Sequence, residues 1–196
     1  MAHIFNPENK EKLISEERRE IFKPENLLLA AGLKEGMSVF DVGCGNGFFA
    51  LPAAKIVGDR GSVFGFDLSQ EMLDALNLRA NKSGIENIKT YKVSKNGVDF
   101  SEIKSQINLE TDFIIMANIL HEVSNVETFL DDYLKWLTED GRLLIIEWRK
   151  KETEAGPGIK HRLEPKKLHD LLNIKGLKAI LSKIINNNYY LKIYKK

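Results

Sequence analysis

The 196-residue sequence contains a single cysteine, Cys44. One thiol cannot form an internal disulfide, and it cannot build a zinc site from several thiolates. Mechanisms that need two cysteines are excluded for the same reason. The chain is long enough to bury one substantial apolar core and too short for two ordinary domains.

Long apolar runs are also missing. Runs such as residues 113–117 and 143–146 hold only a few residues, whereas a helix that crosses a bilayer needs about 20 apolar residues. The N-terminus has no basic stretch followed by a long apolar one, which is the pattern of a secretory signal. We therefore expect a cytoplasmic protein that does not insert into membranes.

The chain has little excess charge of either sign, with 29 Lys and Arg against 28 Asp and Glu. The distribution is uneven, because residues 149–196 hold 13 of the basic and only four of the acidic residues. Such a basic quarter could attract an anionic substrate or nucleic acid, and RNA or protein as the methyl acceptor is the variant it motivates. Lysines on the solvated side of edge strands give the same composition, and we favour that interpretation and expect no nucleic-acid partner.

Helical and strand patterns alternate along the chain, separated by glycine, proline and asparagine. This alternation predicts βαβ units and a parallel sheet. Two final β-rich runs flank residues 186–188 (NNN), which predicts an antiparallel hairpin. We therefore predict an α/β, Rossmann-like fold with a doubly wound, mostly parallel seven-stranded sheet and a C-terminal antiparallel β-hairpin. The expected strands are 37–42, 62–66, 88–93, 112–117, 141–148, 177–185 and 189–194, and the expected helices are 8–31, 47–57, 70–82, 126–137 and 165–173.

A glycine-rich segment, residues 41–47 (DVGCGNG), leaves the first strand and enters a helix. Glycines permit a tight turn and let a ligand lie against bare backbone. Asp67 ends the next strand, 20 residues after Gly47, where a carboxylate can accept hydrogen bonds from both hydroxyls of a ribose. Ligands collect at this edge of a parallel sheet, so the pattern predicts a nucleoside-containing ligand.

Two features of this segment bear on which nucleoside it binds. The dinucleotide pattern G-x-G-x-x-G requires a third glycine at position 48, which is Phe48. Asp41 would repel a pyrophosphate but is compatible with sulfonium and ammonium groups. The segment therefore favours a cationic nucleoside without phosphate. A nicotinamide-dependent oxidoreductase and a non-catalytic cofactor-binding module remain the alternatives.

Four segments together resemble the class I S-adenosylmethionine-dependent methyltransferases. They are residues 41–47, 65–73, 111–123 and 141–148. The third is similar to the small-molecule branch that includes the ubiquinone and menaquinone biosynthesis methyltransferases. The resemblance implies S-adenosyl-L-methionine as cofactor, a small-molecule acceptor, and a single methyltransferase domain over 1–196 that is a monomer or homodimer. Within it we expect a helical cover at 1–34, a cofactor-binding core at 35–150, and a lid loop, helix and hairpin at 151–196.

The resemblance also implies residue roles. The glycines would pass under the methionine part of the cofactor while Asp41 steadies them, Asp67 would bind the ribose, and Leu68 would pack on the adenine. Ser94 and Lys95 lie on the segment that reaches the adenine edge, and the carbonyls of Met116 and Ala117 would meet the amino group. The expected cofactor-binding residues are Asp41, Gly43, Cys44, Gly45, Gly47, Asp67, Leu68, Met72, Ser94, Lys95, Met116 and Ala117.

Methyl transfer needs a base only if the acceptor atom holds a proton at neutral pH. His121 follows the fourth strand and titrates nearest neutrality, so it is the candidate catalytic base; the alternative is a histidine that positions a loop. No metal is expected, because residues 116–118 offer no carboxylates to a divalent ion. Further candidates to face the acceptor are Glu147, Trp148, His161 and Arg162, although a structural role is the simpler interpretation.

Overall fold

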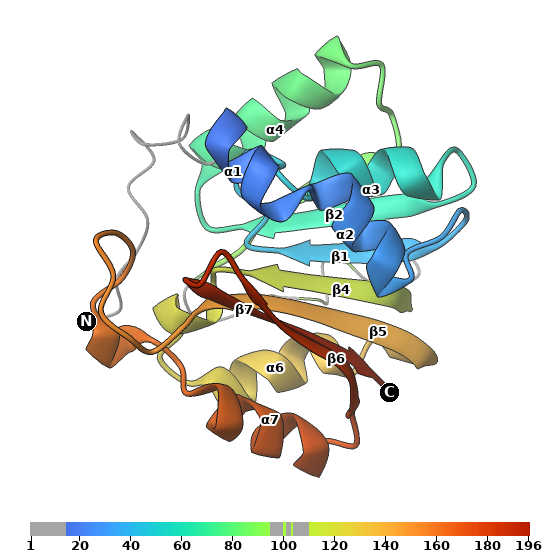
Figure 1. Cartoon of the computed structure of the whole chain (residues 1–196). Coiled ribbons are helices and arrows are strands. Elements are labelled where there is room, and N and C mark those ends of the chain that lie inside the picture. Colours follow the sequence, from blue (N-terminus) through green and yellow to red (C-terminus); the bar gives the residue numbers. More distant parts are fainter. Residues whose placement is uncertain (1–14, 95–99, 101–102, 104–109) are drawn as a thin grey trace.

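The computed structural model describes residues 15–94, 100, 103 and 110–196. Its centre is a seven-stranded sheet in the order β3-β2-β1-β4-β5-β7-β6 (Figure 1). Strands β1 to β5 pair in parallel, and β7 runs antiparallel between β5 and β6. The predicted fold is therefore confirmed, including the terminal hairpin. The strands are β1 Ser38–Val42, β2 Ser62–Asp67, β3 Ile88–Lys92, β4 Thr111–Ala117, β5 Leu137–Trp148, β6 Lys178–Ile185 and β7 Tyr189–Lys195.

Helices cover both faces of this sheet (Figure 1). One apolar layer packs α1 to α4 against the sheet, and the other packs α6 and α7 against the opposite face. Successive strand residues enter opposite layers, as Val39 and Phe40 do in β1, because a strand covered on both sides is apolar on both sides. The helices are α1 Glu16–Phe22, α2 Pro24–Ala31, α3 Ala50–Val57, α4 Gln70–Lys82, α6 Val126–Leu134 and α7 Pro165–Ile174, with short 3₁₀ turns η2 Leu120–Glu122 and η3 Ile159–His161.

Several helix ends lie where the sequence places them. Pro24 is the first residue of α2, and Gly32 ends that helix with a φ of 94°. Ser69 Oγ accepts a hydrogen bond from the Met72 backbone N–H at 3.4 Å and so caps α4. Asn125 caps α6 in the same way. Local chemistry alone accounts for these ends.

Other boundaries differ from the prediction. The helical region expected at 8–31 is interrupted at Lys23, whose φ is 42°, and its first part lies outside the described residues. The helix expected to reach residue 137 ends at Leu134, and β5 starts at Leu137 rather than at Gly141. Leu137 pairs with Thr111 across a register shift in β4, so sheet pairing extends the strand beyond its apolar run. Helix α3 starts late, at Ala50, as the proline two residues on predicts.

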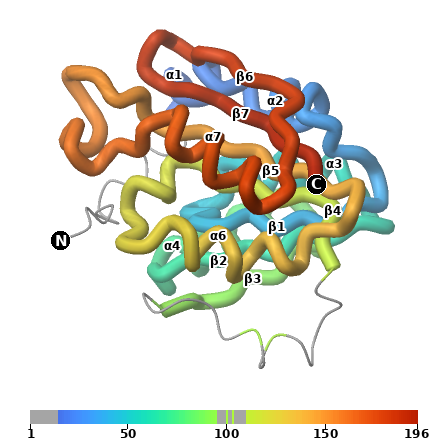
Figure 2. The backbone as a smooth tube through the Cα atoms, turned by 90° about the horizontal axis from the view of Figure 1, so that it is seen from below, coloured from blue at the N-terminus to red at the C-terminus, as the bar shows by residue number. Residues whose placement is uncertain are grey.

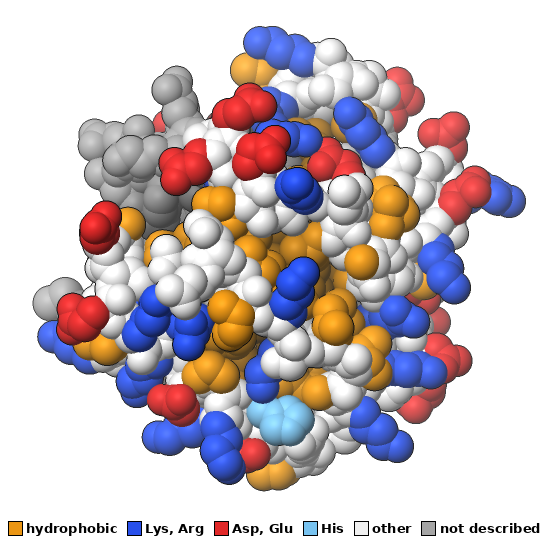
Figure 3. Space-filling model, viewed as in Figure 1, with side chains coloured by type: hydrophobic (Ala, Val, Ile, Leu, Met, Phe, Trp, Pro, Cys, Tyr) orange, Lys and Arg blue, Asp and Glu red, His pale blue; other side chains and the backbone are white. Residues whose placement is uncertain are grey.

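Helix α1 lies against the turn end of the terminal hairpin (Figure 2). Phe22 of α1 meets the ring of Tyr189 edge-on, with 4.9 Å between the ring centroids. On the side of the molecule that faces the viewer in Figure 1, apolar side chains reach the surface and are interspersed with Lys and Arg (Figure 3). No helix in the described ranges is long and apolar enough to cross a bilayer. The packing of α1 matters below because it brings a cation to the carboxyl ends of the strands.

Candidate functional site

The glycine-rich segment forms a tight loop at the carboxyl end of β1. The backbone N–H groups of Gly43 and Cys44 both donate to the carbonyl of Phe66, at 2.8 and 3.0 Å, which ties the loop to β2. Gly43, Gly45 and Gly47 have φ values of 71°, 52° and 89°, a region that favours glycine. A Cβ at Gly43 would lie 2.3 Å from Cδ1 of Ile119, so any larger residue there would also have to displace that side chain.

Asp67 joins this loop to the start of α4. Its Oδ2 accepts a hydrogen bond from the Gly45 N–H at 2.8 Å, and its Oδ1 accepts one from the Ser69 N–H at 2.9 Å. Burial raises the pKa of this carboxyl, while the same two amides and that of Leu68 oppose the rise. The carboxylate thus sits at the rim of the glycine loop with its orientation set by backbone donors.

Asp41 is buried at the end of β1, with 2% of its surface exposed. The Ala50 amide hydrogen-bonds to its carboxyl group, but Oδ2 has no hydrogen-bond partner among the described residues. Burial and the nearby charge of Asp67 raise the pKa of Asp41 to about 7. A buried carboxylate of this kind becomes stably charged only when a cation approaches it.

Arg18 on α1 is one such cation, and the sequence did not single it out. Its guanidinium lies over the ring of Phe48, 4.5 Å from the centroid, and 5.7 Å from that of Phe22. Burial lowers the pKa of Arg18 to about 10, and the charge of Asp41 opposes that change. No local pattern could have revealed it, because the packing of α1 alone decides which of its polar residues turns inward.

Asn118 is a second residue to which the sequence patterns did not assign a role. It follows β4 with a φ of 57°, in the left-handed region that asparagine tolerates better than most residues. Its Oδ1 is buried without a hydrogen-bond partner among the described residues. Strained backbone and an unpaired buried oxygen are typical of functional sites. Its position in the 111–123 segment was the available signal, but backbone strain cannot be seen in sequence.

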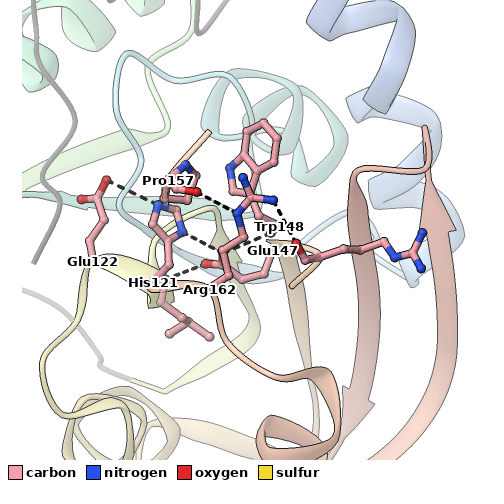
Figure 4. A network of polar contacts seen from close by, with 8 residues as sticks. His121, Glu122, Glu147, Trp148, Pro157 and Arg162 are labelled. Atoms are coloured by element: carbon pink, nitrogen blue, oxygen red, sulfur yellow. Dashed lines mark hydrogen bonds and ion pairs between the residues drawn. The ribbon is translucent and has the colours of Figure 1, made fainter. Parts of the chain in front are cut away.

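His121 lies in η2 and is held by a buried carboxylate (Figure 4). Its Nδ1 is 2.8 Å from Oε2 of Glu147, a fully buried residue near the end of β5. Glu147 also accepts hydrogen bonds from the backbone N–H groups of Leu120, at 2.7 Å, and Trp148, at 3.3 Å. On the other side, His121 Nε2 is 3.8 Å from Oε1 of Glu122. The imidazole is thus oriented by one carboxylate and faces a second.

The surroundings of His121 act on its pKa in opposite directions. Burial alone would lower that pKa, but the hydrogen bond and charge of Glu147 and the charge of Glu122 raise it above its ordinary value. Arg162 opposes the rise. These neighbours on balance stabilise the protonated imidazole, so the ring holds its proton more tightly than an ordinary histidine does.

The remaining predicted residues differ in how far they are buried. Met116 pairs with Val42 beside the glycine loop and is fully buried, and Ala117 follows it half-buried. Met72 is buried on α4, whereas 36% of Leu68 is exposed at the rim of the site.

Ser94 and Cys44 complete the set. Ser94 is exposed just after β3, and Lys95 lies outside the described residues. Cys44 is buried, and burial first, then the charges of Asp41 and Asp67, raise the pKa of its thiol. A neutral packed thiol fits the interpretation of Cys44 as a small residue within the loop.

Comparisons with known proteins agree with this architecture. The family model described as a methyltransferase domain matches residues 33–195. A crystal structure of a SAM-dependent methyltransferase from Aquifex aeolicus is 30% identical, covers 98% of this chain and 99% of its own, and superposes with a TM-score of 0.85.

Curated relatives match over shorter stretches. The ubiquinone/menaquinone biosynthesis C-methyltransferase UbiE of Shewanella pealeana is 26% identical over 149 residues, 76% of this chain and 53% of the relative. Aklanonic acid methyltransferase DauC of Streptomyces sp. strain C5 is 40% identical over 53 residues, 27% of this chain and 24% of the relative. The chain thus spans about a quarter to a half of these relatives' lengths. It belongs to the methyltransferase domain family and, within that family, to the class I S-adenosylmethionine-dependent methyltransferases.

Proposed function

We propose that this chain transfers a methyl group from S-adenosylmethionine to a small-molecule acceptor. The observation that carries the proposal is the buried Asp41 carboxylate, whose Oδ2 lacks a hydrogen-bond partner among the described residues. It lies beside a loop whose glycines have positive φ angles. The negative charge of Asp41 would repel a pyrophosphate there but is compatible with a cation. The donor set therefore fits the proposed cofactor.

On the cofactor side, each residue has a proposed task. S-adenosylmethionine, when bound, supplies a methyl group activated by a positively charged sulfur. Asp41 would stabilise the positive groups, and Asp67 would use its remaining lone pairs for the ribose, since a carboxylate offers about four acceptor sites. The exposed Leu68 would pack on the adenine. Ser94 and Lys95 are proposed for the adenine edge, Met72 for packing at this rim, and the carbonyls of Met116 and Ala117 for the amino group.

On the acceptor side, we propose that His121 takes a proton from the acceptor atom. Glu147 as a carboxylate accepts the Nδ1–H, so the free lone pair of the neutral ring lies on Nε2. The dyad therefore supports an acceptor that holds a proton at neutral pH, such as a hydroxyl or an amine. A histidine that only positions η2 is the competing role, and it predicts methyl transfer that is independent of the His121 protonation state.

We further propose that the acceptor is not nucleic acid and that the protein is a monomer or a homodimer. Acidic side chains accompany lysines of the basic C-terminal quarter: Lys195 Nζ lies 2.8 Å from Asp140, and Lys175 Nζ lies 2.5 Å from Asp131. RNA binding that weakens steeply with salt would contradict the first statement. Light scattering of the purified protein tests the second.

Calorimetric titration with S-adenosylhomocysteine tests the cofactor site. Wild type should bind with a Kd of about 1–100 μM, and Asp67→Ala should weaken binding about 10-fold or more, since a hydrogen bond to a charged group contributes about 1.5–3 kcal/mol. Asp74→Ala, which removes an exposed carboxylate from α4, is the matched control and should bind like wild type. Failure of wild type to bind at millimolar ligand would overturn the proposal. Binding of reduced nicotinamide cofactor would then favour the oxidoreductase.

A further inference from the structure

The segment that follows β5, residues 149–157, passes beside the His121–Glu147 pair (Figure 4). Resting on the proposed function, this is the side on which the acceptor binds. We infer that Arg162 is a positioning residue that holds residues 149–157 and Trp148 as a fixed wall of the acceptor site. The segment, here called the Arg162 loop, is then a preformed surface that selects the acceptor by shape.

The first observation is that the Arg162 loop closes around one guanidinium. Arg162 itself is 5% exposed. A guanidinium has five N–H groups in one plane, and each of the five hydrogen bonds of Arg162 engages a different acceptor on the loop. Nε donates to Pro157 O at 2.8 Å, Nη1 to Arg149 O at 3.0 Å and Lys151 O at 2.7 Å, and Nη2 to Thr153 Oγ1 at 2.6 Å and Ala155 O at 3.3 Å.

The acceptors follow a regular order along the chain. They belong to every second residue from 149 to 157, so the loop turns alternate residues inward around the cation. Thr153 reinforces the ring, because its hydroxyl also donates to Ala155 O at 2.6 Å. None of the five acceptors is a carboxylate, so neutral dipoles solvate the buried charge. Opening the loop would strip a buried cation of these partners, which strongly favours the closed arrangement.

The second observation is that the same cluster fixes Trp148. The Arg162 guanidinium lies over the indole, 5.1 Å from the ring centroid. The bare backbone of Gly156 lies against the ring, where an added Cβ would be 2.8 Å from it. The indole also meets the ring of Tyr189, with 4.3 Å between the ring centroids. The ring is therefore enclosed from several directions.

The third observation connects this wall to the reacting end of the site. The backbone N–H of Trp148 donates to the Glu147 carboxylate that orients His121. Arg149 anchors the loop to the hairpin turn, since its Nη1 donates to the side-chain oxygen of Asn187 at 2.7 Å. A displacement of the Arg162 loop would therefore disturb the His121–Glu147 pair, the ring of Trp148 and the hairpin turn at the same time. A freely moving lid would need these contacts to break at once.

Limited trypsin digestion of the full chain tests the inference, because Arg149, Lys150 and Lys151 are cleavage sites within the loop. Wild type should resist cleavage there, since the protease needs a locally unfolded segment. Arg162→Lys keeps the charge but loses the planar donors, and cleavage at these sites should accelerate about 10-fold or more. Arg142→Lys is the matched control. Arg142 lies within β5, and its guanidinium, like that of Arg162, donates to a backbone carbonyl, that of Ala31. It should leave the loop as resistant as in wild type.

A second readout separates positioning from mere support of the fold. The charged groups facing His121 are Glu147 on β5, Glu122 on η2 and Arg162 beyond the loop. Arg162→Gln should therefore raise the pKa of His121 in an NMR titration, whereas Arg142→Gln should leave it unchanged. Gly156→Ala, which leaves Arg162 in place, should shift the Trp148 fluorescence in a Trp136→Phe background. This variant remains informative if the Arg162 variants fail to fold.

The outcomes separate this inference from the proposed function. Rapid cleavage at residues 149–151 of folded wild type, with S-adenosylhomocysteine binding intact, would overturn the fixed wall and establish a mobile lid. Equal cleavage of wild type and Arg162→Lys would likewise overturn the role of Arg162. Loss of cofactor binding in wild type would instead contradict the proposed function, whatever the digestion shows. Slow cleavage that only the Arg162 variant accelerates, together with the shifted His121 pKa, is the supporting result.

Discussion

The two halves of the site are built differently. The cofactor half, at the ends of β1 and β2, relies on backbone groups: amides hold Asp67, and glycines leave space. The acceptor half, at the ends of β4 and β5, relies on side chains far apart in sequence, such as His121 and Glu147, 26 residues apart. Both halves join the ends of adjacent strands, but the first does so through backbone amides, which almost every residue carries, whereas the second depends on two particular side chains.

The two halves also differ in how their buried carboxylates are partnered. Asp41 is buried with an oxygen that lacks a hydrogen-bond partner among the described residues, so a cationic ligand would stabilise its charged form. Glu147 is fully buried but is bonded to two backbone amides and an imidazole. A ligand should therefore change the cofactor half more than the acceptor half. The following predictions, from the largest expected effect to the smallest, sharpen or break this comparison.

Replacing Glu147 should cause the largest loss. Glu147→Ala leaves the Leu120 amide and His121 without their buried partner, which should lower the free energy of unfolding by about 3–5 kcal/mol. Methyl transfer to an acceptor found by screening should fall about 100-fold or more, the contribution of a positioned base. Urea unfolding and single-turnover assays measure the two effects. Glu139→Ala, an exposed change at the opposite end of β5, should cost less than about 0.5 kcal/mol.

Gly43→Ala should damage the cofactor half through both strain and collision. Gly36 provides the control, because it shares a positive φ, 81° against 71°, but has nothing within 4 Å of an added Cβ. We expect Gly36→Ala to cost about 1 kcal/mol of stability and Gly43→Ala about 2 kcal/mol more. Ile119→Val should recover part of that excess in the double variant. Equal costs for the two alanines would show that the Ile119 contact does not constrain the loop.

Asp41 should make the ligand-free protein less stable as pH rises. Its pKa is near 4 when unfolded and about 7 when folded, so the folded state binds the proton more tightly. Its stability contribution is complete below about pH 4 and is lost as pH rises through 7, by at most about 1.4 kcal/mol per unit. Asp41→Asn should flatten this slope in denaturation curves between pH 5 and 8. Identical slopes would mean that Asp41 is already charged in the free protein.

Glu122→Gln should produce the smallest effect. Glu122 lies beyond hydrogen-bond distance from His121 Nε2, at 3.8 Å, and acts through its charge. Removing that charge should lower the pKa of His121 and move the acid limb of the pH–rate profile to lower pH with it. NMR titration of His121 gives the first quantity directly. Glu139→Gln should leave both unchanged, and a large shift there would indicate an effect of overall charge.

Local signals account for what could be predicted. Glycines at 43–47, the Ser69 cap and the Asn-rich turn each act within a few residues, so their structural consequences can be inferred from sequence. The predicted start of β5, at Gly141, was wrong by four residues. The strand begins at Leu137 because pairing with Thr111 overrides the weak β propensity around Gly141. Arg18 was missed because the direction in which its side chain points depends on how Phe22 packs α1.

The sequence by itself determined the order of strands and helices, the glycine loop and the acid that follows β2, because hydrophobic periodicity and backbone conformational limits act locally. Only the tertiary structure decided that Glu147 meets His121, that Arg18 lies over the ring of Phe48, and that Arg162 lies at the centre of its loop. These contacts depend on which strand ends become neighbours and on how much water burial removes. Neither quantity is a property of any short segment.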